Sequence, residues 1–299
     1  MHVILAGASG LIGSALAEAL GTQANRVTRL VRRAPRTADE VQWEPGRVSL
    51  DPRALEGADA VVALGGASIG KLPWSEAYRK QILDSRVIAT RTIADALEAL
   101  GEGAPAFLSA SAVGYYGSAP GRVLDESSPA GDTFLARVCV EWEREALRAE
   151  HVSRVALLRT AMVLHPEGVL RPLMLLTKLG ISGPIGGGQQ IWPWISLDDE
   201  VRAIMHVLTS EISGPVNLVA PEPANNRDIG GELARQLRRP FIVPAPAFAV
   251  RAALGKDAAD SLLLADAHVV PSVLEANGFT FAHPDLESAF EVALREKRG

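Results

Sequence analysis

Three glycines near the N-terminus have the spacing of a turn that holds a phosphate group. They stand in the run Gly7-Ala8-Ser9-Gly10-Leu11-Ile12-Gly13, directly after the apolar stretch Val3–Ala6. The first glycine permits a tight turn, the second lets backbone approach a pyrophosphate, and the third allows a helix to pack closely on a strand. A helix start here offers free N–H groups and a partial positive charge. The alternative is a plain glycine-rich turn, but the position between strand and helix favours a dinucleotide site formed by Gly7, Ser9, Gly10, Leu11, Ile12 and Gly13.

The residues around the next apolar run indicate which dinucleotide the site binds. A site for NAD places an acidic residue roughly 20 residues after the glycines, where it binds the ribose 2′-hydroxyl. This chain has no Asp or Glu between Glu18 and Asp39. Two of the arginines in that stretch, Arg32 and Arg33, fall just past the predicted strand Val27–Val31, where guanidinium groups can bind a 2′-phosphate. We predict NADP(H) as the cofactor; the alternative is a solvated basic turn.

A third segment is expected to pass beneath the cofactor. Leu64, Gly65 and Gly66 end the apolar run that starts at Ala60. Glycines at such a strand end let backbone lie close to the ribose and the pyrophosphate, although an ordinary turn would also account for them.

The elements that must position these residues alternate between short apolar runs and longer helical patterns. Strands are predicted at Val3–Ala6, Val27–Val31, Ala60–Leu64, Ala106–Ser109 and Val155–Arg159, and helices at Leu11–Leu20, Glu76–Leu100, Thr133–Arg148 and Leu197–Leu208. This alternation predicts an α/β fold with a Rossmann-type, doubly wound parallel sheet. We expect residues 1–240 to form the nucleotide-binding domain, with 165–240 supplying a substrate-facing region. Residues 241–299 are expected to form a small C-terminal helical domain that ends in a helix at Leu286–Lys297.

Composition excludes several classes of function. A net charge of −5 provides no electrostatic attraction for nucleic acid or anionic lipid. Cys139 is the single cysteine, so neither an intramolecular disulfide nor a cysteine zinc cluster can form, and the scattered histidines predict no metal site. No apolar run approaches the roughly 20 residues of a membrane-spanning helix, and the N-terminus lacks a signal-peptide pattern. We expect a cytoplasmic monomer or homodimer that acts on a small molecule and binds neither nucleic acid nor membrane.

Several motifs together resemble a known family. The glycine run, Ser109-Ala110-Ser111 and Tyr116-Gly117 resemble the extended short-chain dehydrogenase/reductases (SDRs). More closely, the chain is similar to an atypical SDR subgroup called epimerase family proteins, including its small C-terminal domain from about residue 247. The segments that carry this likeness are Ala67-Ser68-Ile69 with Trp74, Asp84-Ser85-Arg86, Ser109–Gly117, Cys139 with Trp142-Glu143, and Trp192–Ile195. The resemblance implies that Ser109 and Met162 lie beside the cofactor, with a core methionine as the alternative for Met162.

The departure from the SDR pattern concerns catalysis. SDR enzymes use a Tyr as acid/base, a Lys four residues later that lowers its pKa, and a Ser that orients the substrate oxygen. Ser111 matches this Ser. Alignment on Glu143 places Leu135 at the Tyr position and Cys139 at the Lys position, and Arg86 replaces the Asn that usually kinks the preceding helix. The Tyr-x-x-x-Lys pair is therefore missing.

Two tyrosines are the plausible replacement acids, because Tyr115 and Tyr116 stand close to Ser111. The hypothesis is that one of them donates a proton to a carbonyl reduced by NADPH, while Ser111 bonds the same oxygen; the alternative is that both pack under a loop. Cys139 lies on a core-facing helical stripe, which favours a small buried hydrophobe over a thiolate activated by Arg86. Trp192 and Trp194 are expected either to wall a substrate pocket or to belong to the core.

The sequence thus predicts an NADP(H)-binding atypical SDR, an oxidoreductase or epimerase-like enzyme for a small carbonyl or hydroxyl compound. The alternative is a non-catalytic NADP(H)-binding redox sensor or regulatory protein, which the missing Tyr-Lys pair favours. A nucleotide-sugar epimerase or dehydratase is a weaker hypothesis, because that chemistry relies on the missing Tyr-Lys pair.

Overall fold

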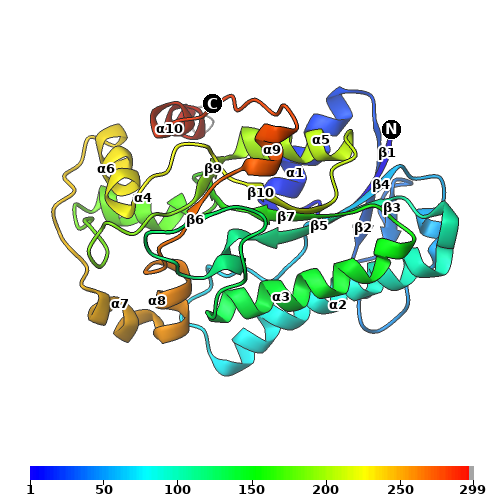
Figure 1. Ribbon diagram of the computed structural model, residues 1–299, viewed down its shortest axis with the longest axis horizontal. Coiled ribbons are helices and arrows are strands. Elements are labelled where there is room, and N and C mark those ends of the chain that lie inside the picture. The colour runs from blue at the N-terminus through cyan, green and yellow to red at the C-terminus, as the bar shows by residue number, and fades with distance from the viewer. Residues whose placement is uncertain (296–299) are drawn as a thin grey trace.

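A seven-stranded parallel sheet forms the centre of the computed structural model, which describes residues 1–295 (Figure 1). Its order is β3-β2-β1-β4-β5-β7-β10, so the chain reverses direction across the sheet between β1 and β4. The strands are β1 (His2–Ala6), β2 (Arg26–Val31), β3 (Glu40–Gln42), β4 (Ala60–Ala63), β5 (Ala106–Ala112), β7 (Val155–Thr160) and β10 (Gly214–Leu218). This arrangement confirms the predicted Rossmann-type doubly wound sheet.

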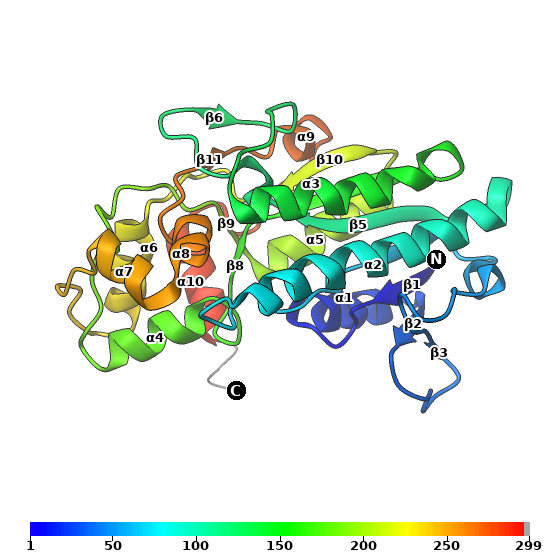
Figure 2. The ribbon, with the colours of Figure 1, turned by 90° about the horizontal axis from the view of Figure 1, so that it is seen from below.

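The sheet is covered on both faces because its strands are apolar at every position. In β1, Val3 and Leu5 belong to one buried cluster while Ile4 belongs to the cluster on the opposite face. Alternate side chains of a strand point to opposite faces, so a continuous apolar run requires helices on both sides. Helices α1 (Leu11–Thr22) and α5 (Leu197–Leu208) cover one face, and α2 (Glu76–Leu100) and α3 (Phe134–Leu147) cover the other (Figure 2).

Side-chain caps fix where three of these helices begin. The hydroxyls of Ser75, Thr133 and Ser196 accept hydrogen bonds from backbone N–H groups in the first turns of α2, α3 and α5. Such caps satisfy N–H groups that have no partner within the helix. The bounds of α2 and α5 agree with the sequence prediction, and those of α3 differ by one residue at each end.

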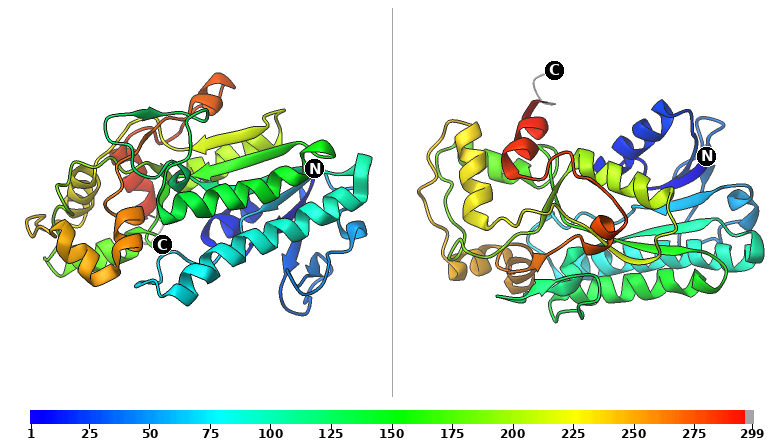
Figure 3. Two further views of the ribbon diagram at one scale, coloured as in Figure 1. Left: turned by 60° about the horizontal axis from the view of Figure 1, so that its bottom comes forward. Right: turned by 45° about the horizontal axis from the view of Figure 1, so that its top comes forward.

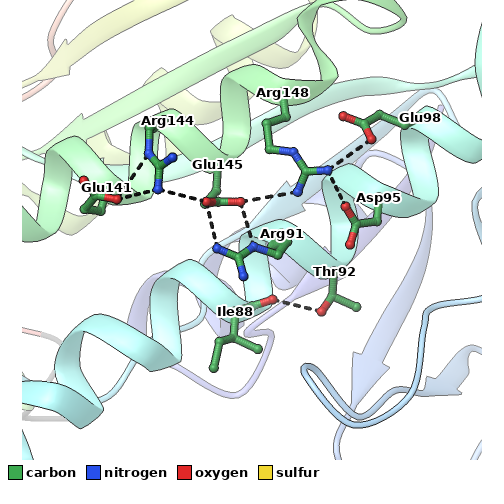
Figure 4. Close-up of polar contacts among 9 residues, drawn as sticks. All are labelled: Ile88, Arg91, Thr92, Asp95, Glu98, Glu141, Arg144, Glu145 and Arg148. Atoms are coloured by element: carbon green, nitrogen blue, oxygen red, sulfur yellow. Dashed lines mark hydrogen bonds and ion pairs between the residues drawn. The ribbon is translucent and has the colours of Figure 1, made fainter.

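Ion pairs tie α2 to α3 on the outer face (Figure 4). Glu145 is 3% exposed and accepts two hydrogen bonds of 2.9 Å from Arg91 of α2. Arg144 and Arg148 also approach this carboxylate, and Arg148 reaches Asp95 at 2.7 Å. The outer face of this helix pair is therefore charged rather than apolar.

The remaining helices gather at one end of the sheet (Figures 1 and 3). They are α4 (Leu170–Lys178), α6 (Asn226–Gln236), α7 (Ala247–Leu254), α8 (Lys256–Leu262) and α10 (Leu286–Arg295), whereas α9 (Ser272–Ala276) packs beside β10. Two small parallel sheets join β8 (Met162–Leu164) to β9 (Trp194–Ser196) and β6 (Val123–Leu124) to β11 (His268–Val269). Short 3-10 helices occur at η1 (Pro52–Leu55), η2 (Gly101–Gly103), η3 (Val113–Tyr116) and η4 (Arg148–His151).

One strand end differs from the sequence prediction, and two further features were not predicted. Strand β5 runs to Ala112 rather than ending at Ser109, and β10, which comes from the region 165–240, completes the main sheet. The segment after residue 240 also joins the rest of the chain, because β11 pairs with β6 and Arg79 of α2 forms an ion pair with Asp257 of α8. The predicted helix end at Lys297 lies outside the described residues.

No helix within residues 1–295 combines the length and the apolar character needed to cross a bilayer. In the same residues, no group of three or more His, Cys, Asp or Glu side chains is arranged to hold a metal ion.

Candidate cofactor and catalytic site

The turn between β1 and α1 is shaped so that two of its glycines cannot be replaced. Gly7 has φ of +90°, and a Cβ placed there would lie 2.8 Å from the backbone nitrogen of Gly65. A Cβ at Gly13 would lie 2.2 Å from the carbonyl oxygen of Gly7. Both contacts are shorter than real side chains allow, so the turn folds closely onto the first turn of α1 and onto the end of β4.

Two other glycines of the region leave space that the protein itself does not use. At Gly10 an added Cβ would meet only the Gly7 carbonyl oxygen, at 3.4 Å, and at Gly65 it would meet nothing within 4 Å. Gly10 also stands at the start of α1, where no side chain caps the helix and no acidic residue lies in the first turn. An exposed, uncapped helix start where the strand order reverses fits the pyrophosphate of a dinucleotide. Ser9 is exposed, while Leu11 and Ile12 are half-buried at the same edge.

The two arginines predicted to bind a 2′-phosphate differ in their contacts. Both follow β2 and are exposed. Arg33 donates to both oxygens of the Glu40 carboxylate, at 2.8 and 2.6 Å, and this pairing lowers the pKa of Glu40 to about 2. No carboxylate among the described residues lies within ion-pair distance of Arg32. The guanidinium of Arg32 is therefore free to bind a phosphate, whereas that of Arg33 is already paired with Glu40.

Three other predicted cofactor residues differ in how far they are buried. Leu64 and Met162 are half-buried, and Met162 packs at the edge of an apolar cluster that contains Trp192 and Trp194. Ser109 is fully buried in β5, and its hydroxyl donates to the carbonyl of Ala110 at 3.3 Å. The structure thus places Ser109 inside the sheet, paired with Ala63 at the end of β4, and its contact with the cofactor stays a prediction.

A buried polar network lies at the ends of β5 and β7. Ser111 is 4% exposed and donates to Glu143 at 2.6 Å, and Arg159 donates twice to the same carboxylate, at 2.9 Å each. Burial alone would lower the pKa of Arg159, but the hydrogen bonds and charge of Glu143 outweigh it and raise that pKa. Ser111 was predicted to orient a substrate oxygen; in the structure its hydroxyl is committed to Glu143.

Tyr116 belongs to the same network. Its hydroxyl donates to Asn217 at 2.7 Å and accepts from Arg159 at 2.9 Å, and its side chain is 2% exposed. Burial raises its pKa to about 12, against the opposing effect of Arg159. A phenol that is buried, doubly hydrogen-bonded and harder to ionise is poorly suited to proton exchange with a substrate, so the structure argues against Tyr116 as the acid.

Tyr115 differs from its neighbour. It is half-buried, and its hydroxyl forms no hydrogen bond with any residue in the described part of the chain. The guanidinium carbon of Arg159 lies 3.6 Å from the centre of the Tyr115 ring. The rings of Tyr115 and Tyr116 pack edge to face. The ring is thus held from two sides while the hydroxyl stays available.

Cys139 and Arg86 lie close enough to interact, as a thiolate activated by Arg86 would require, but the thiol is not activated. Burial, with a further contribution from Glu143, raises the pKa of Cys139 to about 12, although Arg86 acts in the opposite direction. Arg86 donates to the carbonyls of Ala67 and Ile82, at 3.2 and 2.9 Å, and lies over the Trp142 ring. The structure favours a buried structural thiol at Cys139. Arg86 instead holds the loop that follows β4.

Sequence reasoning missed several polar residues that organise this region. Arg159 was assigned only to a strand, and Asn217 and Glu126 received no role. Asn217 donates to the carbonyl of Val270, and one oxygen of Glu126 accepts from the backbone of Asn217 and Val273. The one available signal was the charged Arg159 at the end of an otherwise apolar run, because a buried arginine requires a partner.

Glu200 is a further residue that the sequence did not single out. It lies in the first turn of α5, is fully buried, and accepts a hydrogen bond of 2.8 Å from Thr160 at the end of β7. Its second oxygen has no hydrogen-bond partner among the described residues. Burial raises its pKa to about 8, so the carboxyl is mostly protonated at neutral pH.

This carboxyl is expected to make stability depend on pH. Because its pKa is raised in the folded protein, its stabilising contribution is complete below the usual value of 4.5 and is lost as the pH rises through about 8. We expect the free energy of unfolding to fall by roughly 3–4 kcal/mol between pH 5 and pH 8 from this group alone. In urea unfolding at both pH values, Glu200→Gln should remove that loss. The exposed Glu18→Gln variant should keep the loss, and an unchanged pH dependence in Glu200→Gln would contradict the assignment.

Comparison with known proteins identifies related chains. Residues 3–219 match the NAD dependent epimerase/dehydratase family, and residues 245–293 match a domain of unknown function, DUF1731. An epimerase family protein of Mycobacterium tuberculosis is 42% identical over 294 residues, which cover 97% of both chains. The human epimerase family protein SDR39U1 is 31% identical over 299 residues, covering 97% of this chain and 99% of the human one.

Two solved structures are also similar over nearly the whole chain. Human epimerase family protein SDR39U1 with NADPH has a TM-score of 0.89 and 30% identity, covering 98% of this chain and 99% of that one. A nucleoside-diphosphate sugar epimerase from Corynebacterium glutamicum has a TM-score of 0.80 and 32% identity. The match covers 98% of this chain and 58% of the Corynebacterium chain.

Proposed function

The chain belongs to the NAD-dependent epimerase/dehydratase family, and from this premise we propose that it is an NADP(H)-dependent oxidoreductase or epimerase-like enzyme for small carbonyl or hydroxyl compounds. The observation that carries the proposal is the combination of two features at one edge of the sheet. One is the open, uncapped glycine turn at the start of α1, and the other is the unpartnered hydroxyl of Tyr115 after β5. The carboxyl ends of parallel strands meet at this edge, which is where dinucleotides and their substrates bind in such sheets.

The choice of NADP(H) over NAD(H) depends on the end of β2. The free guanidinium of Arg32 and the absence of any acidic residue from 19 to 38 favour a 2′-phosphate over a ribose 2′-hydroxyl. The related human protein, whose structure contains NADPH, supports the same choice.

Substituting Arg32 tests this choice of cofactor. We expect Arg32→Ala to weaken NADPH binding roughly 10- to 100-fold, as lost charge-assisted hydrogen bonds do, and to leave NADH binding unchanged. Fluorescence titration with each cofactor measures both affinities. Arg26→Ala, at the opposite end of β2, is the matched control and should bind NADPH as tightly as the unmodified protein. Tighter binding of NADH than NADPH by the unmodified protein would show that the cofactor is wrongly assigned.

In the proposed reaction, bound NADP(H) supplies or accepts a hydride at the substrate carbon. Tyr115 moves the proton: its hydroxyl gives a proton to the carbonyl oxygen during reduction and takes it back from the alcohol during oxidation. The guanidinium of Arg159 lies against the Tyr115 ring and holds it in place, while the hydroxyl stays free to exchange its proton. Glu143 holds Arg159 in place and accepts a further hydrogen bond from Ser111, and Arg86 holds the loop after β4 beneath the cofactor.

The direct test is titration with NADPH followed by turnover against a panel of neutral and charged carbonyl compounds. Consumption of NADPH by any of them supports the proposal. Tight NADPH binding without turnover of the whole panel contradicts an oxidoreductase.

One observation favours a second function, the non-catalytic NADP(H)-binding sensor. The position where SDR enzymes carry their catalytic Tyr holds Leu135, which packs with Phe134 and Trp74 in an apolar cluster. The same cluster contains Tyr78, but its hydroxyl donates to the carbonyl of Ser68 at 2.6 Å. A redox sensor would bind NADPH and NADP⁺ with different affinities and would change its conformation or partner, while Tyr115→Phe would leave both affinities unchanged.

A further inference from the structure

A cavity of about 310 Å³ lies among the helices at the end of the sheet, between α4, α6 and α7. Leu173 and Leu176 of α4, Leu233 of α6 and Val250 of α7 contribute to its walls, and Trp192 closes part of it. None of the residues that line it is charged. Its volume is at the lower end of the range for small-molecule sites, which are mostly apolar with a few placed polar groups.

One polar group in this apolar wall has no protein partner. The other three polar side-chain groups are satisfied. Thr177 donates to the carbonyl of Leu173 at 2.8 Å, Ser182 to that of Pro240 at 3.3 Å, and the indole N–H of Trp192 to that of Leu263 at 3.2 Å. Asn226 is 3% exposed, and its Oδ1 accepts from the backbone of Ile185 at 2.8 Å. Its Nδ2 group donates to no atom of residues 1–295. An amide donor that is nearly buried is normally hydrogen-bonded, so this one indicates a missing acceptor.

The cavity is not a product of loose packing around it. The segment from Phe241 to Ala245 crosses its outer side, and the backbone of Val243 and Ala245 donates to the carbonyls of Ser182 and Pro184. A Cβ at Gly183 would lie 2.2 Å from the Val243 carbonyl oxygen, and one at Gly230 would lie 2.5 Å from the Phe241 ring. The wall is therefore closely packed at both glycines, and the space beside it is part of the shape of the protein.

We propose that this cavity binds an uncharged, apolar small molecule with a single hydrogen-bond acceptor, which receives the Nδ2–H of Asn226. A charged ligand would lose its hydration here without gaining a partner, and an ordered water needs two to four polar partners. The side chains of Leu176, Ile181 and Val243 line the cavity and are 41%, 51% and 44% exposed, so an apolar molecule meets apolar surface as it enters. The site is separate from the dinucleotide turn and does not depend on the proposed reaction.

The neutral fluorophore prodan, which has one ketone oxygen and emits at shorter wavelength in apolar surroundings, tests the proposal. We expect saturable, blue-shifted binding to the full-length protein. Ala249→Phe fills the cavity from α7 and should weaken this binding at least about tenfold. Asn226→Asp keeps the acceptor for Ile185 but removes the donor, and should weaken it by roughly tenfold, the effect of one hydrogen bond. Gly231→Ala, on α6 where an added Cβ meets nothing within 4 Å, should bind like the unmodified protein.

NADPH titration of the same variants separates this site from the cofactor site. NADPH affinity should be unchanged in all three, which also shows that they are folded. The proposal is overturned if prodan shows no saturable blue shift, or if Ala249→Phe binds it as tightly as the unmodified protein. It is also overturned if the apolar surface proves to be covered by a second copy, seen as concentration-dependent dimerisation in sedimentation that Ala249→Phe abolishes.

Discussion

Replacing Tyr115 by Phe is expected to reduce turnover of a carbonyl substrate by roughly 100-fold or more, while the affinity for NADPH stays the same. General acid catalysis contributes about 10²- to 10⁴-fold in enzymes, and Tyr115 has the one tyrosine hydroxyl near the ends of β5 and β7 that no described residue hydrogen-bonds. The ring remains in place in the variant, because Arg159 and the edge of Tyr116 hold it without using the hydroxyl.

The neighbouring tyrosine provides the matched control. Tyr116→Phe removes a hydroxyl that lies inside the protein between Asn217 and Arg159, so it should lower stability and change turnover little. Steady-state assays at several pH values separate the two, since loss of the acid should flatten the pH profile of kcat only in Tyr115→Phe. Full turnover in Tyr115→Phe would exclude the proposed proton donor. Equal loss in both variants would indicate that the whole network, rather than one hydroxyl, supports the reaction.

Replacing Arg159 by Met is expected to lower the free energy of unfolding by about 3–5 kcal/mol, the usual cost of breaking a buried ion pair by removing one partner. Arg159 and Glu143 are 3% and 7% exposed, and two hydrogen bonds of 2.9 Å join them. Without the guanidinium, Glu143 keeps only the hydroxyl of Ser111 as a hydrogen-bond donor. Urea unfolding followed by circular dichroism measures the change.

A double variant shows whether the loss comes from the unpaired charge. When both members of a buried pair become apolar, no charge is left without a partner. Glu143→Met with Arg159→Met should therefore cost less than the sum of the two single variants. If the losses of unfolding free energy in the two single variants simply added up in the double variant, the two side chains would act independently. That result would contradict the hydrogen-bonded pair seen in the structure. The exposed Arg137→Met, on α3, controls for the loss of a surface arginine.

The sheet and its cofactor turn were predictable because short-range patterns determine them. Continuous apolar runs such as Val3–Ala6 can only be strands covered on both faces, and the spacing of Gly7, Gly10 and Gly13 leaves few other structures. Strand β10 escaped prediction because Gly214 and Pro215 suggest a turn, while Asn217 interrupts the apolar pattern. Its place at the sheet edge depends on pairing with β7, which no local pattern reveals.

The catalytic region was predicted only in part because its partners are distant in sequence. Ser111 and Tyr116 were recognised by type and position, yet their hydroxyls meet Glu143 and Asn217, which are 32 and 101 residues away. Which way each side chain points depends on strand register and helix packing, and neither follows from residue type. Glu200 shows the same limit, since an acidic residue in the first turn of a helix usually faces solvent and complements the helix dipole.

The pairing of β11 with β6 has a consequence for the way the chain folds as it is synthesised. The glycine turn and most of the main sheet leave the ribosome first. At that point Asn217 and Glu126 still lack some of their hydrogen-bond partners. Asn217 needs the carbonyl of Val270, and Glu126 needs the backbone of Val273. Until the segment with β11, Val270 and Val273 emerges and docks, β6 has no strand to pair with, and Asn217 and Glu126 keep unsatisfied polar groups. A stop codon after about residue 240 would thus leave a chain that contains the whole nucleotide motif but cannot complete the fold around it.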